Sequence, residues 1–126
     1  MSIHESAENY LETILILSQR KPDVRSIDIA NELNFSKPSV SVAMKNLRNS
    51  GHILMDENGH ITLTESGMDI ANTIYERHTL LTRALTMLGV EETTAAEDAC
   101  RIEHVISPES IRAIKKHITG KENPST

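Results

Sequence analysis

The chain has few cysteines and few aromatic residues, two features that stabilise many small proteins. Its 126 residues include one cysteine, no tryptophan, one phenylalanine and two tyrosines. A single cysteine cannot form a disulfide within the chain, so a disulfide framework is excluded and a reduced thiol is expected. With so few aromatic residues the core must consist of Leu, Ile, Val, Ala and Met, and three of these favour helices.

Long apolar runs are absent as well. The longest covers residues 14–17, which is far too short to span a bilayer, and the N-terminus has no basic region followed by an apolar segment. We therefore expect a soluble cytoplasmic protein with no membrane partner. The length allows one medium domain or two small ones.

The net charge of −5 hides an uneven distribution. From Arg20 to Met55 the chain has six basic and three acidic residues, a local charge of +3, so the rest carries −8. A basic region in an acidic protein is compatible with a DNA-reading element whose remaining surface repels phosphates. An uneven solvated surface would give the same pattern.

Hydrophobic periodicity and turn residues predict the order of elements. Ser26 can cap the second helix, Pro38 stands in the first turn of the third, and Asn58-Gly59 indicates a hairpin. Gly89 ends a long helix, and Ser107-Pro108 separates the last two. The expected helices cover 6–18, 26–34, 37–49, 64–88, 93–106 and 108–119, with strands at 52–55 and 60–63.

This order is that of a winged helix-turn-helix followed by helices. The predicted fold is mainly α with a small β-hairpin wing: a winged helix-turn-helix DNA-binding domain at 1–63, a helical domain at 64–120, and a disordered tail at 121–126. In such a fold the third helix enters the major groove of DNA. Spacing directs its apolar residues inward and leaves a polar face. The candidate DNA-binding residues are Arg25, Lys37, Ser39, Ser41, Lys45 and Arg48. A helical protein with a solvated polar face is the alternative.

A second pattern indicates metal. Cys100, Glu103 and His104 have i, i+3, i+4 spacing and lie beside an apolar stripe, so one helix can present a thiolate, a carboxylate and an imidazole together. One helix rarely completes a coordination shell. Further candidate ligands are His78, which interrupts the apolar series of the long helix, and Glu12 with Asn9. Each also has a structural explanation, as a core histidine, a solvated carboxylate or a buried thiol. The remaining histidines, His4, His52, His60 and His117, have no comparable partners.

The segments ENYLETI, IYERHTLL and ACRIEHVIS closely resemble the diphtheria toxin repressor family of iron- and manganese-dependent repressors, over about residues 5–118. The resemblance implies a homodimer that binds a double-stranded operator with two-fold related half-sites. A short two-domain form is implied as well, in which the helical domain at 64–120 binds metal and dimerises. It also implies that Cys100, Glu103 and His104 match primary ligands of the iron-responsive branch, whereas Glu12 and His78 match ligands of the manganese-responsive branch.

The chain departs from both branches. Asn9 replaces a methionine or an aspartate ligand, and Thr82 and Ala96 stand where the iron branch has ancillary ligands, so a second site is absent or rebuilt from Glu12, Glu103 and His78. A thiolate favours Fe(II), Zn(II), Co(II) or Ni(II) over Mn(II), and we expect Fe(II) first and Mn(II) second. The metal would act as corepressor and join the two halves of the chain.

Other function classes remain open. A winged-helix regulator could sense an organic ligand, or oxidation of Cys100. An enzyme is not expected, because no HExxH motif, Gly-rich phosphate loop or nucleophile elbow occurs.

Overall fold

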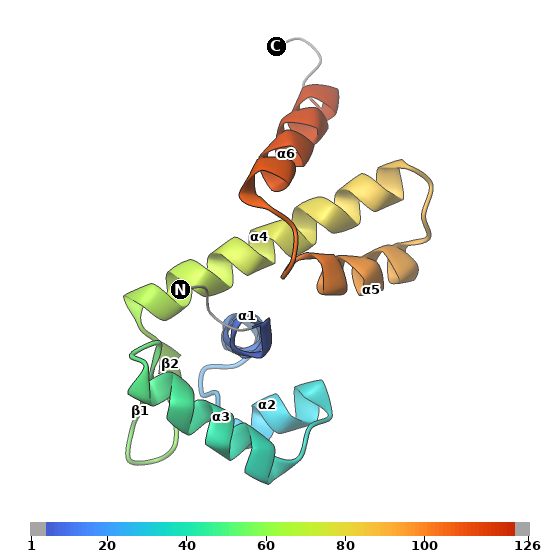
Figure 1. Ribbon diagram of the computed structural model, residues 1–126. Coiled ribbons are helices and arrows are strands. Elements are labelled where there is room, and N and C mark those ends of the chain that lie inside the picture. Colours follow the sequence, from blue (N-terminus) through green and yellow to red (C-terminus); the bar gives the residue numbers. More distant parts are fainter. Residues whose placement is uncertain (1–4, 123–126) are drawn as a thin grey trace. The chain divides into compact units, whose positions relative to one another are not determined.

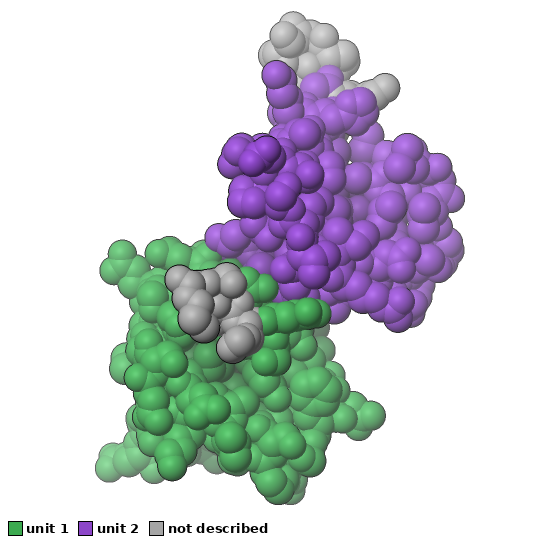
Figure 2. Space-filling model, in the orientation of Figure 1, with its two compact units in different colours: residues 1–72 green, residues 73–126 purple. Residues whose placement is uncertain are grey.

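The computed structural model describes residues 5–122, except the side chains of 121 and 122. The chain forms two compact units, residues 1–72 and 73–126, here called the N-terminal unit and the C-terminal unit (Figure 2). The described residues are mainly helical with one small hairpin, which confirms the predicted fold class (Figure 1). None of the described helices has the length and apolar character needed to cross a membrane.

The N-terminal unit has the element order of a winged helix-turn-helix. α1 packs against α2 and β2, and α3 packs against α2 and β1. The elements are α1 (Glu5–Arg20), α2 (Ser26–Leu33), α3 (Lys37–Asn49), β1 (Ile53–Met55), β2 (Ile61–Leu63) and the start of α4 (Glu65–Met87). Every element from α1 to β2 contributes to one buried core, whose members include Leu11, Ile14, Ile29, Val40, Met44, Ile53 and Ile61.

The hairpin is joined to the rest of the unit by a third strand-like segment. β1 and β2 pair antiparallel, and Val24 forms an isolated bridge with Ile61, whose N–H donates to the Val24 carbonyl at 2.7 Å. In the turn, the Asp56 carboxylate accepts from the N–H groups of Asn58 and His60, both at 2.9 Å. These backbone donors, that of His60 first, lower the pKa of Asp56.

The start of α2 differs from the prediction. Arg25, not Ser26, is the N-cap residue, and Ser26 is the first helical residue. The Asp28 carboxylate accepts from the Arg25 N–H at 2.9 Å and from Lys21 Nζ at 2.8 Å. The side chain three residues into the helix therefore does the capping, because it satisfies a backbone donor that Ser26 at the first helical position does not.

Gly67 allows α4 to approach the hairpin. A Cβ atom at this position would overlap the main-chain carbonyl oxygen of His52. That carbonyl also accepts the N–H of Thr64 at 3.1 Å. The first turns of α4 thus lie directly on the chain that leads into β1.

The C-terminal unit consists of the rest of α4 with α5 (Glu92–Ile102) and α6 (Pro108–Glu122). Gly89, with a φ of 101°, ends the long helix as predicted. Glu91 caps α5 by accepting the Thr94 N–H at 3.2 Å. The buried residues described in this unit include Ile74, Leu80, Leu81, Ala95, Ala99, Glu103 and Ile118.

An apolar groove remains open within the C-terminal unit. Its volume is about 780 Å³. Leu88 at its margin is 81% exposed. The lining residues are Leu81, Ala84, Leu85, Met87, Leu88, Ile102, Ala113, Ile114, His117 and Ile118. An exposed apolar groove of this kind is typical of a surface that another protein covers.

The end of α6 lies beyond its predicted position, and the predicted domain boundary stays a prediction. Residues 121 and 122, assigned above to the tail, belong to α6, and residues 123–126 lie outside the described part. The predicted domain boundary after residue 63 follows the end of the hairpin, whereas the compact units divide inside α4, after Asn72.

We expect Gly67→Ala to lower the free energy of unfolding by about 2–4 kcal/mol, because the new methyl group collides with backbone that cannot move without displacing β1. Gly120→Ala is the matched control. It lies in α6 with no atom near its Cβ position, so the change should stabilise the protein by up to about 1 kcal/mol. Chemical denaturation measures both, and equal effects of the two changes would contradict the close approach at Gly67.

We expect Asp28→Asn to cost about 1 kcal/mol at pH 7, because it weakens the helix cap and removes the pairing with Lys21. The hydrogen bond from Lys21 is the largest cause that lowers the pKa of Asp28 in the folded state. Its contribution is therefore present above the unfolded pKa of about 3.9 and is lost as the pH falls through the folded value.

Thermal unfolding of wild type and Asp28→Asn across pH should show two stability curves that converge as the pH falls below about 4. Glu32→Gln removes only an exposed ion pair with Arg20 and should change stability by less than about 0.5 kcal/mol. If the stability curves of wild type and Asp28→Asn stayed parallel across pH, the Asp28 carboxylate would not be the source of the pH-dependent stability.

Candidate metal centre

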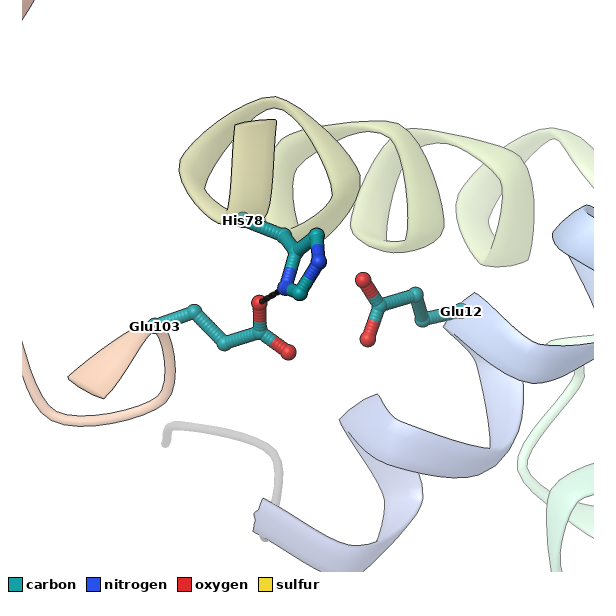
Figure 3. A group of neighbouring side chains, drawn as sticks. All are labelled: Glu12, His78 and Glu103. Carbon is teal, nitrogen blue, oxygen red and sulfur yellow. Dashed lines mark hydrogen bonds and ion pairs between the residues drawn. The ribbon is translucent and has the colours of Figure 1, made fainter. Parts of the chain in front are cut away.

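The C-terminal unit brings His78 and Glu103 into direct contact. Nδ1 of His78, on α4, lies 3.0 Å from Oε2 of Glu103, which follows the last residue of α5 (Figure 3). The Glu103 side chain has no exposed surface, and the His78 side chain is 29% exposed. The predicted ligands His78 and Glu103 are thus neighbours in space, although 25 residues separate them in the chain.

The second oxygen of Glu103 is the unusual feature of this pair. Nε2 of His104 is 3.5 Å from Oε1, too long for a good hydrogen bond, and no donor among the described residues satisfies this buried atom. The His104 side chain is itself only 3% exposed. Burying a carboxylate oxygen without a partner is costly, and a cation removes that cost. Carboxylate and imidazole donors are ligands that first-row divalent metals accept, so these residues fit a metal.

A turn, rather than a continuing helix, carries Glu103 and His104. α5 ends at Ile102, so the prediction that this helix runs to residue 106 is wrong. The guanidinium of Arg77, on α4, donates to the carbonyl oxygens of Glu103 at 3.2 Å and Ile106 at 3.1 Å. α5 has already ended, so these carbonyls accept from a side chain instead of from a continuing helix. Sequence reasoning missed Arg77, whose role depends on this contact between helices.

Cys100 differs from Glu103 in its exposure. It is on α5 and exposed, while its neighbour Ala99 is fully buried. The expected stripe of Cys100, Glu103 and His104 is thus divided between the surface and the interior. Among the described residues, no group of three converging ligand atoms includes Cys100 or His104. Their roles as ligands stay predictions.

The other two candidate ligands belong to the N-terminal unit. Glu12 is 5% exposed on α1 and is labelled in Figure 3. Asn9 is half-buried one turn earlier, and its carbonyl accepts from Thr13 Oγ1 at 2.8 Å. A buried glutamate is uncommon in a small unit, which makes Glu12 the stronger candidate of the two.

The predicted DNA-facing side chains are all exposed. On α3, Val40, Met44 and Leu47 are buried, as the spacing predicts. Ser36 caps this helix by accepting the Ser39 N–H at 3.3 Å. The exposed set comprises Arg25, Lys37, Ser39, Ser41, Lys45 and Arg48.

His60 is not the isolated surface residue that the sequence suggested. Its Nε2 lies 2.9 Å from a guanidinium nitrogen of Arg25, and its Nδ1 lies 3.2 Å from Asp56 and 3.8 Å from Asp23. The prediction failed because these partners lie in other segments of the chain. Arg25, a candidate DNA-binding residue, is thereby held to the hairpin.

Family models match nearly the whole chain in two parts. Residues 2–61 match the N-terminal DNA binding domain of the iron dependent repressors. Residues 64–124 match the iron dependent repressor metal binding and dimerisation domain. The chain belongs to the iron-dependent repressor family. The resemblance inferred from ENYLETI, IYERHTLL and ACRIEHVIS is confirmed, and with it a DNA-binding transcriptional regulator that contains a metal-binding and dimerisation domain.

Individual relatives agree with this assignment. The chain is 33% identical over 113 residues to an uncharacterised helix-turn-helix transcriptional regulator of Methanocaldococcus jannaschii, covering 88% of this chain and 90% of the relative. It is 32% identical over 120 residues to the transcriptional regulator MntR of Lysinibacillus sphaericus, with coverages of 94% and 86%.

Among solved structures, a manganese-dependent transcriptional repressor in complex with manganese aligns with a TM-score of 0.82 and 26% identity, over 90% of this chain and 52% of that one. The chain thus spans about half the length of that solved relative. The comparisons support a metal-dependent regulator and give no support to a sensor of organic ligands or of oxidation.

Proposed function

We propose that this protein is a cytoplasmic repressor of metal-homeostasis genes, in which a divalent transition metal acts as corepressor. The observation that carries the proposal is the fully buried Glu103 carboxylate, with an imidazole on one oxygen and no described donor on the other. Family membership supplies the DNA-binding domain and the metal-binding and dimerisation domain.

We further propose the ligand set. His78, Cys100, Glu103 and His104 provide the donors of the C-terminal unit, and Glu12 with Asn9 provides those of the N-terminal unit. Support comes from the contacts of Glu103 with the two histidines and from the burial of Glu12. Thr82 donates to the main-chain carbonyl of His78 at 2.8 Å, which is a helix contact and leaves no ancillary ligand at that position.

The identity of the metal depends on Cys100. With a thiolate in the ligand set, Fe(II) is the proposed signal and Zn(II), Co(II) and Ni(II) bind in vitro; without it, oxygen and nitrogen donors suit Mn(II). The exposed position of Cys100 makes Mn(II) a close second. Comparing the Fe(II) and Mn(II) affinities of wild type and Cys100→Ser would decide between them.

Bound metal supplies positive charge that offsets the buried carboxylates. Glu12 and Glu103 repel one another when both are charged, so a cation shared by the proposed ligands would offset that repulsion. α1, which carries Glu12, packs against α2 and β2 and so fixes the DNA-binding unit. Half-sites of a two-fold operator lie about 34 Å apart, so only a held geometry allows both units of a dimer to bind.

The required coupling is small. A coupling free energy of about 1–3 kcal/mol per site between metal binding and DNA binding is enough to switch occupancy of an operator. Because coupling is reciprocal, DNA must increase the affinity for metal by the same factor by which metal increases the affinity for DNA. Glu12 is the residue on which this coupling depends, since α1 is an element of the unit that carries α3.

The dimer is proposed to form through the apolar groove of the C-terminal unit. The groove lies between α4, α5 and α6, within the residues that match the dimerisation domain. Burying it against a second copy removes Leu88 and Met87 from water.

We expect DNA binding to appear only with metal. Fluorescence anisotropy with a randomised duplex pool, under anaerobic conditions, should show binding with Fe(II) or Mn(II) and little with buffer alone. Glu103→Gln keeps the size of the side chain but removes its charge, so metal affinity should fall at least about tenfold, and excess metal should partly restore DNA binding. Glu97→Gln, on an exposed position of α5, is the control and should behave as wild type.

Tight DNA binding that ignores every metal would overturn the corepressor proposal. So would a loss in Glu103→Gln that metal does not restore while circular dichroism shows an intact fold.

We expect Leu88→Glu to weaken the dimer at least about tenfold, since it places a charge on a lining residue of the proposed apolar interface. Sedimentation velocity over a concentration series measures the change. Leu54→Glu is the matched control, because Leu54 is 62% exposed but lies in the N-terminal unit. Equal dimer dissociation constants for the two variants would place the interface elsewhere.

A further inference from the structure

Val42 is an apolar side chain on the polar face of α3. It is 61% exposed, whereas Val40, two residues earlier, has no exposed surface. Ser39, Ser41 and Lys45, three of the predicted DNA-facing residues, are exposed on the same helix. Sequence reasoning assigned Val42 no role, because it belongs neither to the buried stripe nor to the polar residues.

The fold gains little from a valine at this position. A β-branched side chain loses rotamer freedom in a helix, so valine is a poorer helix former than alanine, and an exposed one recovers little by burial. A single exposed apolar residue on an ordinary surface needs no explanation. Val42, however, lies in a DNA-binding domain. It belongs to the N-terminal half of α3, the helix that follows the turn, and this half reaches base edges in helix-turn-helix proteins.

The major groove offers one apolar group on its base edges, the C5-methyl group of thymine. The short side chains of Ser39 and Ser41 on either side of Val42 allow the helix to approach closely. Lys45, one turn further on, can neutralise a phosphate. We propose that Val42 packs against the methyl group of a thymine and so specifies that base in each half-site. The proposal rests on α3 entering the major groove, as in the proposed function.

Removal of single methyl groups from DNA tests this contact. Duplexes are first selected from a randomised pool by wild type with Mn(II), and each thymine in the selected duplex is then replaced in turn by deoxyuridine. One replacement per half-site should weaken wild-type binding about fourfold, the effect of one buried methyl group. Val42→Ala should lose sensitivity at that position and keep the wild-type response at every other thymine, as a double-mutant cycle requires.

Lys45→Ala is the control for a contact without base specificity. It should weaken binding to all duplexes alike, lower the salt dependence of binding, and leave the response to deoxyuridine unchanged. Val42→Ala should not unfold α3, because the residue is exposed and alanine is the better helix former. Thermal unfolding of the variant verifies this.

Two results would overturn the proposal: no thymine at which wild type and Val42→Ala differ, or the same selected sequence bound equally well by both. Failure of the metal proposal is separate. If DNA binds without metal, the corepressor role is wrong, yet the deoxyuridine series still measures the Val42 contact. If no duplex is selected under any condition, DNA binding and the Val42 contact both fail.

Discussion

The burial of the Glu103 carboxylate is the constraint on which the C-terminal unit depends. A carboxylate with no exposed surface needs hydrogen-bonding or positive partners, because its removal from water costs several kcal/mol. Arg77 binds main-chain carbonyls of the turn, so its guanidinium holds the position of Glu103 and His104 while the two imidazoles face the carboxylate. The arrangement fixes the turn after α5 and leaves one oxygen of Glu103 without a described donor, a position that suits a cation.

In the N-terminal unit, a few contacts join the hairpin to α2 and α4. One backbone bridge, between Val24 and Ile61, fixes the hairpin beside the start of α2, and Arg25 and His60 extend that junction through their side chains. Gly67 then permits α4 to begin against the same segment. The hairpin and the exposed face of α3 therefore belong to one packed unit. A winged helix-turn-helix requires this, because its recognition helix and its wing contact neighbouring parts of the DNA.

Patterns that act within one segment were predictable from the sequence, and contacts between segments were not. Spacing identified the buried residues of α3, and Asn58-Gly59 identified the hairpin, because helical periodicity and turn chemistry are local. The early end of α5 depends on Arg77 from another helix, and the partners of His60 come from Asp23, Arg25 and Asp56. Local patterns identified Glu103 by its helical spacing and His78 by its place in an apolar series, but their contact across 25 residues was not predictable from either segment alone. The exposure of Cys100 and the position of Val42 required the packed helices themselves.

In the proposed regulator the residues that determine DNA specificity and those that determine metal specificity lie in different units. Residues that choose the DNA, such as Val42 and Lys45, are on α3, and most metal donors are in the C-terminal unit. Either set can therefore change in evolution without disturbing the other. In the proposed mechanism α1 carries the coupling, because α1 packs on α2, α2 packs on α3, and α1 carries Glu12, a proposed metal donor. A ligand shifts the equilibrium between two conformations of a protein only by the difference between its affinities for them. In the proposed mechanism the donors of the C-terminal unit are the same with and without DNA, so the strength of the switch would depend on Glu12 more than on those donors.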